Sequence, residues 1–369
     1  KGFACARSWR AGGAGFGANA KEVAIIRDKV RLEDRAADSQ VFESQTGEVG
    51  AKVGVITIPS FYNNLSADVA KEIAKLKDQS VDGLIIDLRG NGGGSLNEAS
   101  RLTGLFIDRG PVVQIRGGAG NINVLGDYDG VVHYDGPVTV LVDRYSASAS
   151  EIFSAALQDY GRALIVGEQT FGKGTVQEHR PLRKPFDRFD NKLGSVQYTT
   201  SKFYRINGGS TQNKGVIPDI ILPSAIDPAD WGESQEDNAL PWDNIRPARY
   251  MTSEEIRTKV KLLTERHQER IAQEPEFGYL NQDIKEYKDN KDKLFVSLNE
   301  QERLSEKDES KLKRLERMNS RLERLGFDKV KTLEDDTPKE LDQLDPFLEE
   351  TARITADLVS ASQFVKNLK

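Results

Sequence analysis

A lysine that lies between glycines, with several serines upstream, could either bind a phosphate or take part in covalent catalysis. The stretch GEQTFGKGT, residues 167–175, holds Lys173 between Gly172 and Gly174. It fits most of the phosphate-binding loop pattern, in which glycine amides and a lysine hold phosphates and a following Ser or Thr binds Mg²⁺. Gly174 occupies that last position, and the β-like residues after it provide no helix N-terminus for a phosphate. Nucleotide hydrolysis is therefore disfavoured.

The alternative role for Lys173 is that of a general base acting on Ser148. The segment DRYSASASEIF, residues 143–153, places Ser148 where a buried strand ends and a helix begins. The spacing Ser148-x-x-Glu151 also fits a helix capping box, so a plain capping role is the competing interpretation. A serine nucleophile needs a base, and a lysine can serve only as a neutral amine, which burial favours. Lys173 follows the next strand, so both side chains can meet at one edge of a sheet.

An acyl-transfer site also needs backbone N–H groups to bind the oxyanion. Ala149, at the expected start of the helix, can supply one of them. The glycine run RGNGGGS, residues 89–95, follows another strand and can supply the second, because glycines let the backbone come close to a substrate. Taken alone, this run is also compatible with a mere tight turn.

The composition limits the classes of function. The chain has 369 residues with 52 Lys and Arg against 58 Asp and Glu, and the net charge of −6 argues against nucleic acid as the main partner. No apolar run approaches the ~20 residues of a membrane span. The single cysteine, Cys5, rules out an intrachain disulfide and a cysteine metal cluster. The three histidines are far apart in sequence, which disfavours a zinc site: His133, His179 and His267.

The hydrophobic pattern predicts the elements that must position these residues. From about residue 53, buried strands alternate with amphipathic helices, which indicates an α/β layered core with a parallel sheet. The expected strands are VGVITIP, VDGLIIDLRG, PVTVLVDR and RALIVGE, with one or two more in residues 22–34. Ser66 is expected to cap the first helix of the core, whose buried face carries Val69, Ile73 and Leu76.

Beyond about residue 224 the chain becomes polar and then helical. A connector punctuated by prolines leads to charged helices from Ser253 onward. One apolar stripe ends at Gly326, a C-cap, and consists of Leu312, Leu315, Met318, Leu322 and Leu325. Acidic residues interleave with the Lys and Arg of this region, so solvated helix faces are favoured over a basic stripe for RNA.

The longer motifs resemble the tail-specific proteases, also called carboxyl-terminal processing peptidases, and most closely their bacterial Prc (Tsp) branch. The resemblance runs from about Glu22 to the end and is carried by IPSFY, IIDLRGNGGG, VDRYSASASEIFSAALQDYGRALIVGEQTFGKGTVQ, GSVQYTTSKFYRINGGSTQNKGVIPDII and EDNALPWD. It implies a serine endopeptidase with a Ser–Lys dyad on an α/β core of the ClpP/crotonase-like kind, followed by a C-terminal helical domain. The alternative is a non-catalytic peptide-binding relative on the same fold, and the intact dyad speaks against it.

The family pattern makes Ser148 the nucleophile and Lys173 the general base, and it implies roles for Gly93, Gly94, Glu151, Asp159, Thr170 and Gln177. Gln177 lies four residues past Lys173, so on a strand both side chains face one side and Gln177 can orient the amine. Asp159 lies about 16 Å from Ser148 along a helix, which favours a structural role, such as a pair with Arg162. Glu151 is expected to cap the helix.

The resemblance also predicts the organisation and setting of the chain. The expected parts are a truncated PDZ remnant with lead-in strands (1–50), the α/β protease core (51–224), a connector (225–251) and a helical domain (252–369). Residues 2–20 do not follow the family, and the PDZ loop that binds peptide C-termini is missing, so we expect a fragment of a longer periplasmic protein. The implied partners are unfolded or tagged proteins with apolar C-termini and an adaptor protein, and the resemblance implies no cofactor, nucleic acid or membrane span.

Overall fold

The structure is a computed structural model, and it describes residues 36–46, 49–182, 194–291, 295, 297–342 and 344–367. The strands expected in residues 22–34 and the irregular segment 2–20 lie outside these ranges. Residues 37–369 form one compact unit, to which the following description applies.

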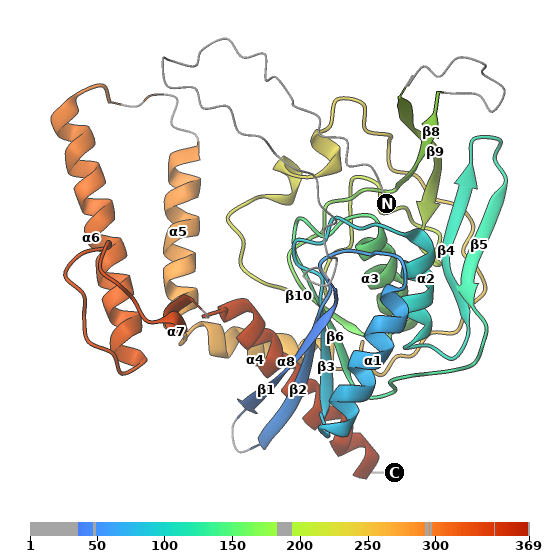
Figure 1. The fold of residues 1–369 in the computed structure, drawn as a ribbon, viewed down its shortest axis with the longest axis horizontal. Coiled ribbons are helices and arrows are strands. Elements are labelled where there is room, and N and C mark those ends of the chain that lie inside the picture. Colours follow the sequence, from blue (N-terminus) through green and yellow to red (C-terminus); the bar gives the residue numbers. More distant parts are fainter. Residues whose placement is uncertain are drawn as a thin grey trace, which may run out of the picture. The chain divides into compact units, whose positions relative to one another are not determined.

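Two sheets form the framework of this unit (Figure 1). The first has six strands in the order β1-β2-β3-β6-β7-β10, and the second has four in the order β5-β4-β9-β8. The strands of the first sheet are β1 (Asp38–Thr46), β2 (Val49–Thr57), β3 (Gly83–Asp87), β6 (Val138–Val142), β7 (Leu164–Gly167) and β10 (Ile220–Ile221). Those of the second are β4 (Gly110–Gly117), β5 (Ile122–Asp127), β8 (Thr175–Pro181) and β9 (Ser195–Tyr204).

The first sheet is parallel from β2 to β10, as the sequence predicts, because helices connect most of its strands. The connecting helices are α1 (Leu65–Asp78), α2 (Leu96–Gly104) and α3 (Ala149–Tyr160). Strand β1 adds an antiparallel edge by pairing with β2 along its whole length, from Asp38 opposite Thr57 to Thr46 opposite Val49. The core sheet therefore begins before residue 50.

Apolar side chains fill both faces of this sheet, because successive residues of a strand point to opposite sides. In β3, Leu84 and Ile86 belong to the cluster on the α1–α3 side, whereas Ile85 belongs to a second cluster on the opposite face. The second cluster contains side chains from helices near the end of the chain, including Leu263, Ile354 and Leu358. Strands covered on both faces have continuous apolar sequences, which is the pattern that predicted them.

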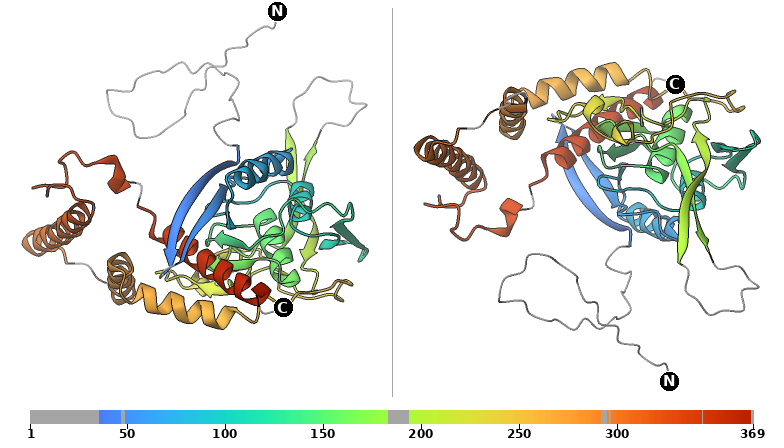
Figure 2. Two further views of the ribbon diagram at one scale, coloured as in Figure 1. Left: turned by 90° about the horizontal axis from the view of Figure 1, so that it is seen from below. Right: turned by 90° about the horizontal axis from the view of Figure 1, so that it is seen from above.

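Helices α4 (Val260–Ile271) and α8 (Pro346–Asn367) cover that second face. Helix α8 contacts β1, β2, β3 and β6, and it lies across the sheet on the side opposite α1 (Figure 2). Within this interface the Thr355 hydroxyl donates to the Thr351 carbonyl at 2.8 Å and forms a second hydrogen bond, of 2.9 Å, with the hydroxyl of Thr139 in β6. The last long helix of the chain is thus a layer of the α/β core.

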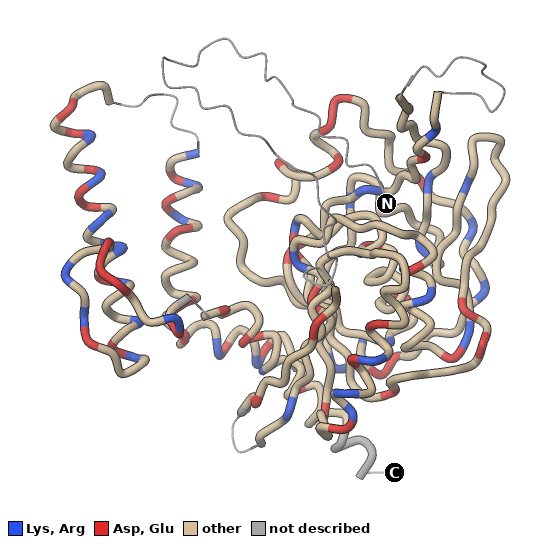
Figure 3. The backbone as a smooth tube through the Cα atoms, in the orientation of Figure 1, with Lys and Arg blue, Asp and Glu red and all other residues tan. Residues whose placement is uncertain are grey.

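The remaining helices are α5 (Pro275–Lys291), α6 (Glu300–Arg324) and the short α7 (Lys339–Asp342). Acidic and basic residues alternate along α5 and α6 (Figure 3), as the interleaved charges of the sequence indicate. Of the predicted apolar stripe, Leu322 is fully buried whereas Leu312 stays exposed. Gly326 follows α6 at a φ of 79°, in the left-handed conformation expected of a helix C-cap.

The expectation that Ser66 caps α1 is wrong. The helix begins at Leu65, and its N-cap is Asn64 in a left-handed conformation. The Ser66 N–H and hydroxyl both donate to the Glu98 carboxylate of α2, which lies 32 residues further along the chain. The predicted buried face is confirmed, since Val69, Ile73 and Leu76 are all buried.

None of the helices that the structure describes is both long and apolar enough to cross a membrane.

Candidate active site

Ser148 occupies a strained turn between β6 and α3. Its φ of 57° and ψ of −108° are unusual for a residue with a side chain, and its side chain is half-buried. Such conformations persist only where the surroundings enforce them, and they concentrate at functional sites. The chain here makes a sharp elbow that presents the Ser148 side chain directly before the N-terminus of α3.

The serines on either side of Ser148 hold the elbow against the glycine run. The Ser146 hydroxyl donates to the Leu88 carbonyl, and the Ser150 hydroxyl donates to the Asn91 carbonyl, each at 2.8 Å. Both side chains are fully buried. Of the three alternating serines, two are therefore structural, and only Ser148 retains partial exposure.

The glycine run packs its backbone directly beneath Ser148. A Cβ atom on Gly93, whose φ is 102°, would lie 2.8 Å from both the Ala147 carbonyl oxygen and the Ser148 Cβ. A Cβ on Gly94 would lie 2.4 Å from the Phe61 carbonyl oxygen. Only glycine fits at these two positions, since each combines a positive φ with a contact too close for a side chain.

The N–H groups around Ser148 differ in their availability. The Gly93 N–H donates to the side-chain oxygen of Asn91 at 2.9 Å. Among the described residues, no hydrogen bond engages the N–H of Ala149 or that of Gly94. Asn91 also donates to the Ile58 carbonyl and is fully buried, a role that the sequence analysis missed. The one available signal was an asparagine embedded between glycines.

The Glu151 carboxylate joins the two predicted catalytic segments. It accepts the Ser148 N–H at 2.7 Å, as a cap would. It also accepts the Thr170 hydroxyl, the Gly172 N–H and the Lys173 N–H, at 2.7, 2.7 and 2.9 Å. Glu151 is fully buried, so four donors from two loops converge on one enclosed carboxylate. Its role is thus wider than the helix cap that its spacing indicated.

Burial raises the pKa of Glu151 to about 7, although hydrogen bonds from Thr170, Gly172, Ser148 and Lys173 favour its charged form. The carboxyl group can therefore change its protonation near neutral pH. Each carboxylate oxygen accepts two donors in the structure, so a proton on either oxygen would displace one of these hydrogen bonds.

Lys173 is half-buried, and its amine donates to the side-chain oxygen of Gln177 at 3.5 Å. Gln177 also accepts from the side chain of Gln197 at 2.8 Å, which links it to β9. Within the described part of the chain, no hydrogen bond joins the Lys173 amine to the Ser148 hydroxyl. Catalytic hydrogen bonds are often long in the absence of substrate and shorten when it binds.

Asp159 lies at the opposite end of α3 from Ser148. Its expected pair with Arg162 is wrong. The carboxylate instead binds Arg205 at 2.6 Å and Asn207 at 2.8 Å. Arg162 donates to the carbonyls of Phe106 and Tyr134. Sequence proximity favoured the nearer arginine, but the turn after β9 brings a better-placed one.

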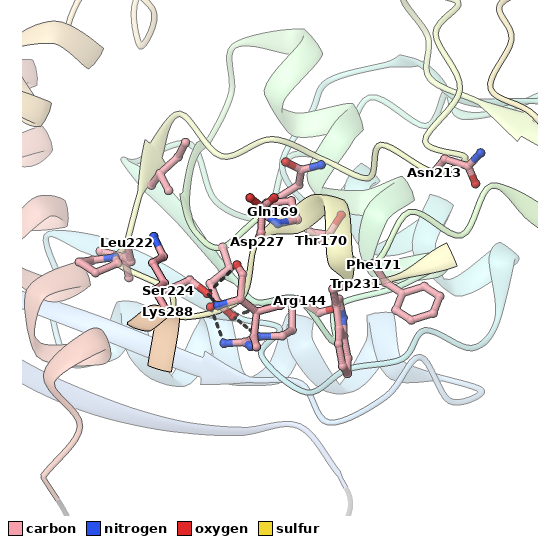
Figure 4. Close-up of a pocket in the computed structure, with 15 residues that line it drawn as sticks. Arg144, Gln169, Thr170, Phe171, Asn213, Leu222, Ser224, Asp227, Trp231 and Lys288 are labelled. Atoms are coloured by element: carbon pink, nitrogen blue, oxygen red, sulfur yellow. Dashed lines mark hydrogen bonds and ion pairs between the residues drawn. The ribbon is translucent and has the colours of Figure 1, made fainter. Parts of the chain in front are cut away.

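A separate cavity of about 360 Å³ is lined by residues that precede Ser148 and Lys173 in the sequence and by the segment after β10 (Figure 4). Arg144 lines one side, and Thr170 and Phe171 line another. Neither Ser148 nor Lys173 lines it. Trp231 closes this region by donating its indole N–H to the Arg144 carbonyl at 3.0 Å.

Comparison with protein families gives two matches that follow one another along the chain. Residues 52–222 match peptidase family S41, and residues 226–360 match the C-terminal domain of tail specific protease.

Similar proteins agree with these matches. A tail-specific protease of Haemophilus influenzae is 47% identical over 346 residues, which are 93% of this chain and 49% of that protein. A probable CtpA-like serine protease of Staphylococcus aureus is 33% identical over 56% of this chain and 38% of its own length. Among solved structures, the photosystem II D1 C-terminal processing protease is 28% identical with a TM-score of 0.44, covering 55% of this chain and 52% of that one. The chain thus spans about half the length of the curated relative that it matches over most of its own length.

Proposed function

The chain belongs to peptidase family S41, the serine-type proteases that include the tail-specific proteases, and on this basis we propose that it is an endopeptidase acting through Ser148 and Lys173. The observation that carries the proposal is the strained elbow at Ser148, which Glu151 ties to the loop of Lys173. A helix cap alone requires neither the strain nor a carboxylate shared with a second loop.

In the proposed reaction the Ser148 hydroxyl oxygen attacks the peptide carbonyl carbon while the neutral Lys173 amine takes its proton. The tetrahedral intermediate collapses to an ester on Ser148, and the leaving amine receives the proton from Lys173. A water molecule then attacks the ester carbonyl while Lys173 takes its proton. The bond to the Ser148 oxygen breaks, the second product leaves as a carboxylic acid, and Lys173 returns the proton to Ser148. Gln177 orients the Lys173 amine through the bond between them.

The oxyanion of the intermediate needs donors that the resting protein does not already use. We assign Ala149 as one donor and Gly94 as the second, since their N–H groups lack partners among the described residues. Gly93 contributes by its close approach to Ser148, because its own N–H is bound by Asn91. Glu151 and Thr170 support the site by holding the two loops together, and Asp159 stabilises the far end of α3.

We propose polypeptides as the substrates, in particular unfolded or tagged proteins with apolar C-termini. Support comes from the names of the relatives, which describe tail-specific and C-terminal processing proteases. We also propose a periplasmic setting with a role in envelope protein quality control, a PDZ domain in the whole protein, and delivery of some substrates by an adaptor. These points rest on the resemblance of the sequence motifs to the tail-specific proteases.

The test compares cleavage of an unfolded reporter protein by the wild type and by Ser148→Ala and Lys173→Arg. Both variants are expected to fold and to lose turnover by at least about a thousandfold, since arginine keeps the charge but cannot give up a proton. The double variant should be little worse than either single one, because nucleophile and base act as a unit. Lys71→Arg, on the exposed face of α1, is the matched control and should retain activity.

Melting curves confirm that each variant is folded. Substantial turnover by folded Lys173→Arg protein would refute the dyad. Reporters that end either in apolar residues or in Asp then test the substrate proposal separately. Equal cleavage of the two would leave the protease assignment intact and remove the preference for apolar tails.

A further inference from the structure

Arg89 connects the glycine run of the active site with the start of helix α8. It directly precedes that run, and its guanidinium group contacts two carboxylates at once. It binds Asp87, at the end of β3, through contacts as short as 2.6 Å. It binds Asp345, 256 residues away in sequence, through paired hydrogen bonds of 3.0 and 2.7 Å. A planar guanidinium held between two carboxylates is fixed in position as well as in charge.

Asp345 is also the residue from which α8 begins. Its side chain accepts the Leu348 N–H at 3.0 Å, and its carbonyl accepts the Glu349 N–H at 2.9 Å. Burial favours a neutral Asp345, but the hydrogen bonds from Arg89 and Leu348 hold its pKa below the ordinary value. The Asp345 carboxylate therefore both caps α8 and binds Arg89. The position of α8 on the sheet and the position of Arg89 consequently depend on each other.

A continuous set of contacts leads from Arg89 to Ser148. The next residue, Gly90, donates its N–H to the Asp143 carboxylate at 3.0 Å, and Asp143 also accepts the N–H of Ser146 in the elbow. Asn91 then accepts the Ala147 N–H and the Ser150 hydroxyl through its carbonyl. Gly93 finally lies against Ser148. Only three residues separate Arg89 from Gly93, whose backbone lies beneath the nucleophile.

We propose that Asp345 is a positioning residue for the active site, which acts through Arg89 to hold the glycine run in the geometry that the oxyanion requires. The inference rests on the proposed protease function. It makes the start of α8 a part of the catalytic scaffold, although α8 follows the nucleophile by almost two hundred residues. A helix whose only task is to cover the sheet has no need of a carboxylate shared with the active-site loop.

The test uses Asp345→Asn. Asparagine caps a helix about as well as aspartate, but it cannot form the charge-assisted fork with Arg89. We expect kcat for an unfolded reporter to fall between about 10- and 100-fold at unchanged KM, since small displacements of catalytic groups have effects of that size. Affinity for a peptide boronate, which places a charged oxygen in the oxyanion site, should fall in parallel. Asp335→Asn, which removes a turn-capping carboxylate without an Arg partner, is the matched control and should match the wild type.

A second readout does not depend on catalysis. Amide hydrogen exchange over residues 90–95 should be faster in Asp345→Asn than in the parent, including in a Ser148→Ala background, while α8 keeps its protection. Arg89→Lys should show the same change, and the double variant should add little to it. If Asp345→Asn lowers the melting temperature but leaves kcat and the exchange of 90–95 unchanged, Asp345 is only a helix cap and the proposal is wrong. If the wild type lacks protease activity yet the exchange still accelerates, the proposed function fails and the coupling of α8 to the loop stands.

Discussion

Helices α4 and α8 and helices α5 and α6 come from one stretch of the chain but differ in how they are held. The first pair buries apolar side chains such as Leu263, Ile354 and Leu358 in the second core of the sheet. The second pair has few buried apolar residues, Phe277 in α5 and Leu322 in α6, and otherwise presents charges. The difference shows that a shift to charged helical sequence does not by itself mark a separate domain. Part of the C-terminal region is protease core, and part is attached to it.

The ionic contacts of the two pairs differ in the same way. Glu350 of α8 has no exposed surface and lies 3.0 Å from His267 and 2.8 Å from Arg270 of α4. Glu276 of α5 is partly exposed and binds Arg321 and Arg324 of α6. A buried charge without its partners is far more costly than an exposed one. Equivalent changes in the two networks should therefore have unequal effects.

The largest effect is expected from Glu350→Ala. The change leaves His267 and part of the Arg270 guanidinium buried without a partner, and it should lower the free energy of unfolding by about 3–5 kcal/mol. Glu276→Ala, the matched change between α5 and α6, should cost about 1 kcal/mol. Denaturant unfolding followed by tryptophan fluorescence measures both. Equal losses would show that the two helix pairs do not differ as their burial indicates.

Two cavity-forming substitutions, one in each helix pair, should differ somewhat less in their effect on stability. Ile354→Ala removes a fully buried side chain from the second core and should destabilise the whole unit by about 2–4 kcal/mol. Leu322→Ala should loosen α5 and α6 without weakening the sheet. Amide hydrogen exchange distinguishes these results. Faster exchange in β3 and β6 in the Leu322→Ala protein would contradict the distinction.

The smallest effects are expected from pH, and they should have opposite signs at the catalytic edge and in α5. Folding raises the pKa of Glu151 from the ordinary 4.5 to about 7. The folded protein then holds this proton more tightly than the unfolded chain, so the resulting stability is complete below about pH 4.5 and disappears as pH rises through 7. Glu151→Gln should remove this pH dependence from unfolding curves recorded between pH 4.5 and 8.

Glu276 should respond in the other direction. Burial works against its charged form, but the hydrogen bonds from Arg321 and Arg324 lower its pKa below 4.5. Its contribution is therefore present above about pH 4.5 and is lost as pH falls through the lowered pKa. Exchange in α5 and α6 should accelerate in acid, and Glu276→Gln should abolish that change. A pH-independent α5 in the wild type would oppose this assignment.

The sequence predicted the parts of the fold that local pattern controls. The strands around Ile85, Val140 and Ile165 were predictable because a strand covered on both faces reads as an unbroken apolar run. The β4–β5 hairpin was missed because its sequence, GPVVQIRGGAGNINVLGD, is broken by glycines and polar residues and one of its faces is exposed.

Long-range partners could not be predicted in this way. Ser66 and Asp159 were given roles from their neighbours in sequence, whereas their partners are Glu98 of α2 and Arg205 after β9. Arg89 and Asp345 are 256 residues apart, and no local sequence pattern indicates that they are in contact. Ser146 and Ser150 carried a partial signal, because a single helix cap does not require three serines.

The hydroxyl pair of Thr355 and Thr139 has a consequence for the register of α8. If the helix slid along the sheet by one turn, the Thr139 hydroxyl would lose Thr355 as its partner, whereas the Thr355 hydroxyl would keep the Thr351 carbonyl of its own helix. A buried hydroxyl left without a partner costs about 1–3 kcal/mol. The apolar residues of α8 could tolerate such a shift, because aliphatic contacts are not directional. The threonine pair therefore favours the observed longitudinal setting of α8. That setting determines whether Asp345, the residue that caps the helix, comes within reach of Arg89.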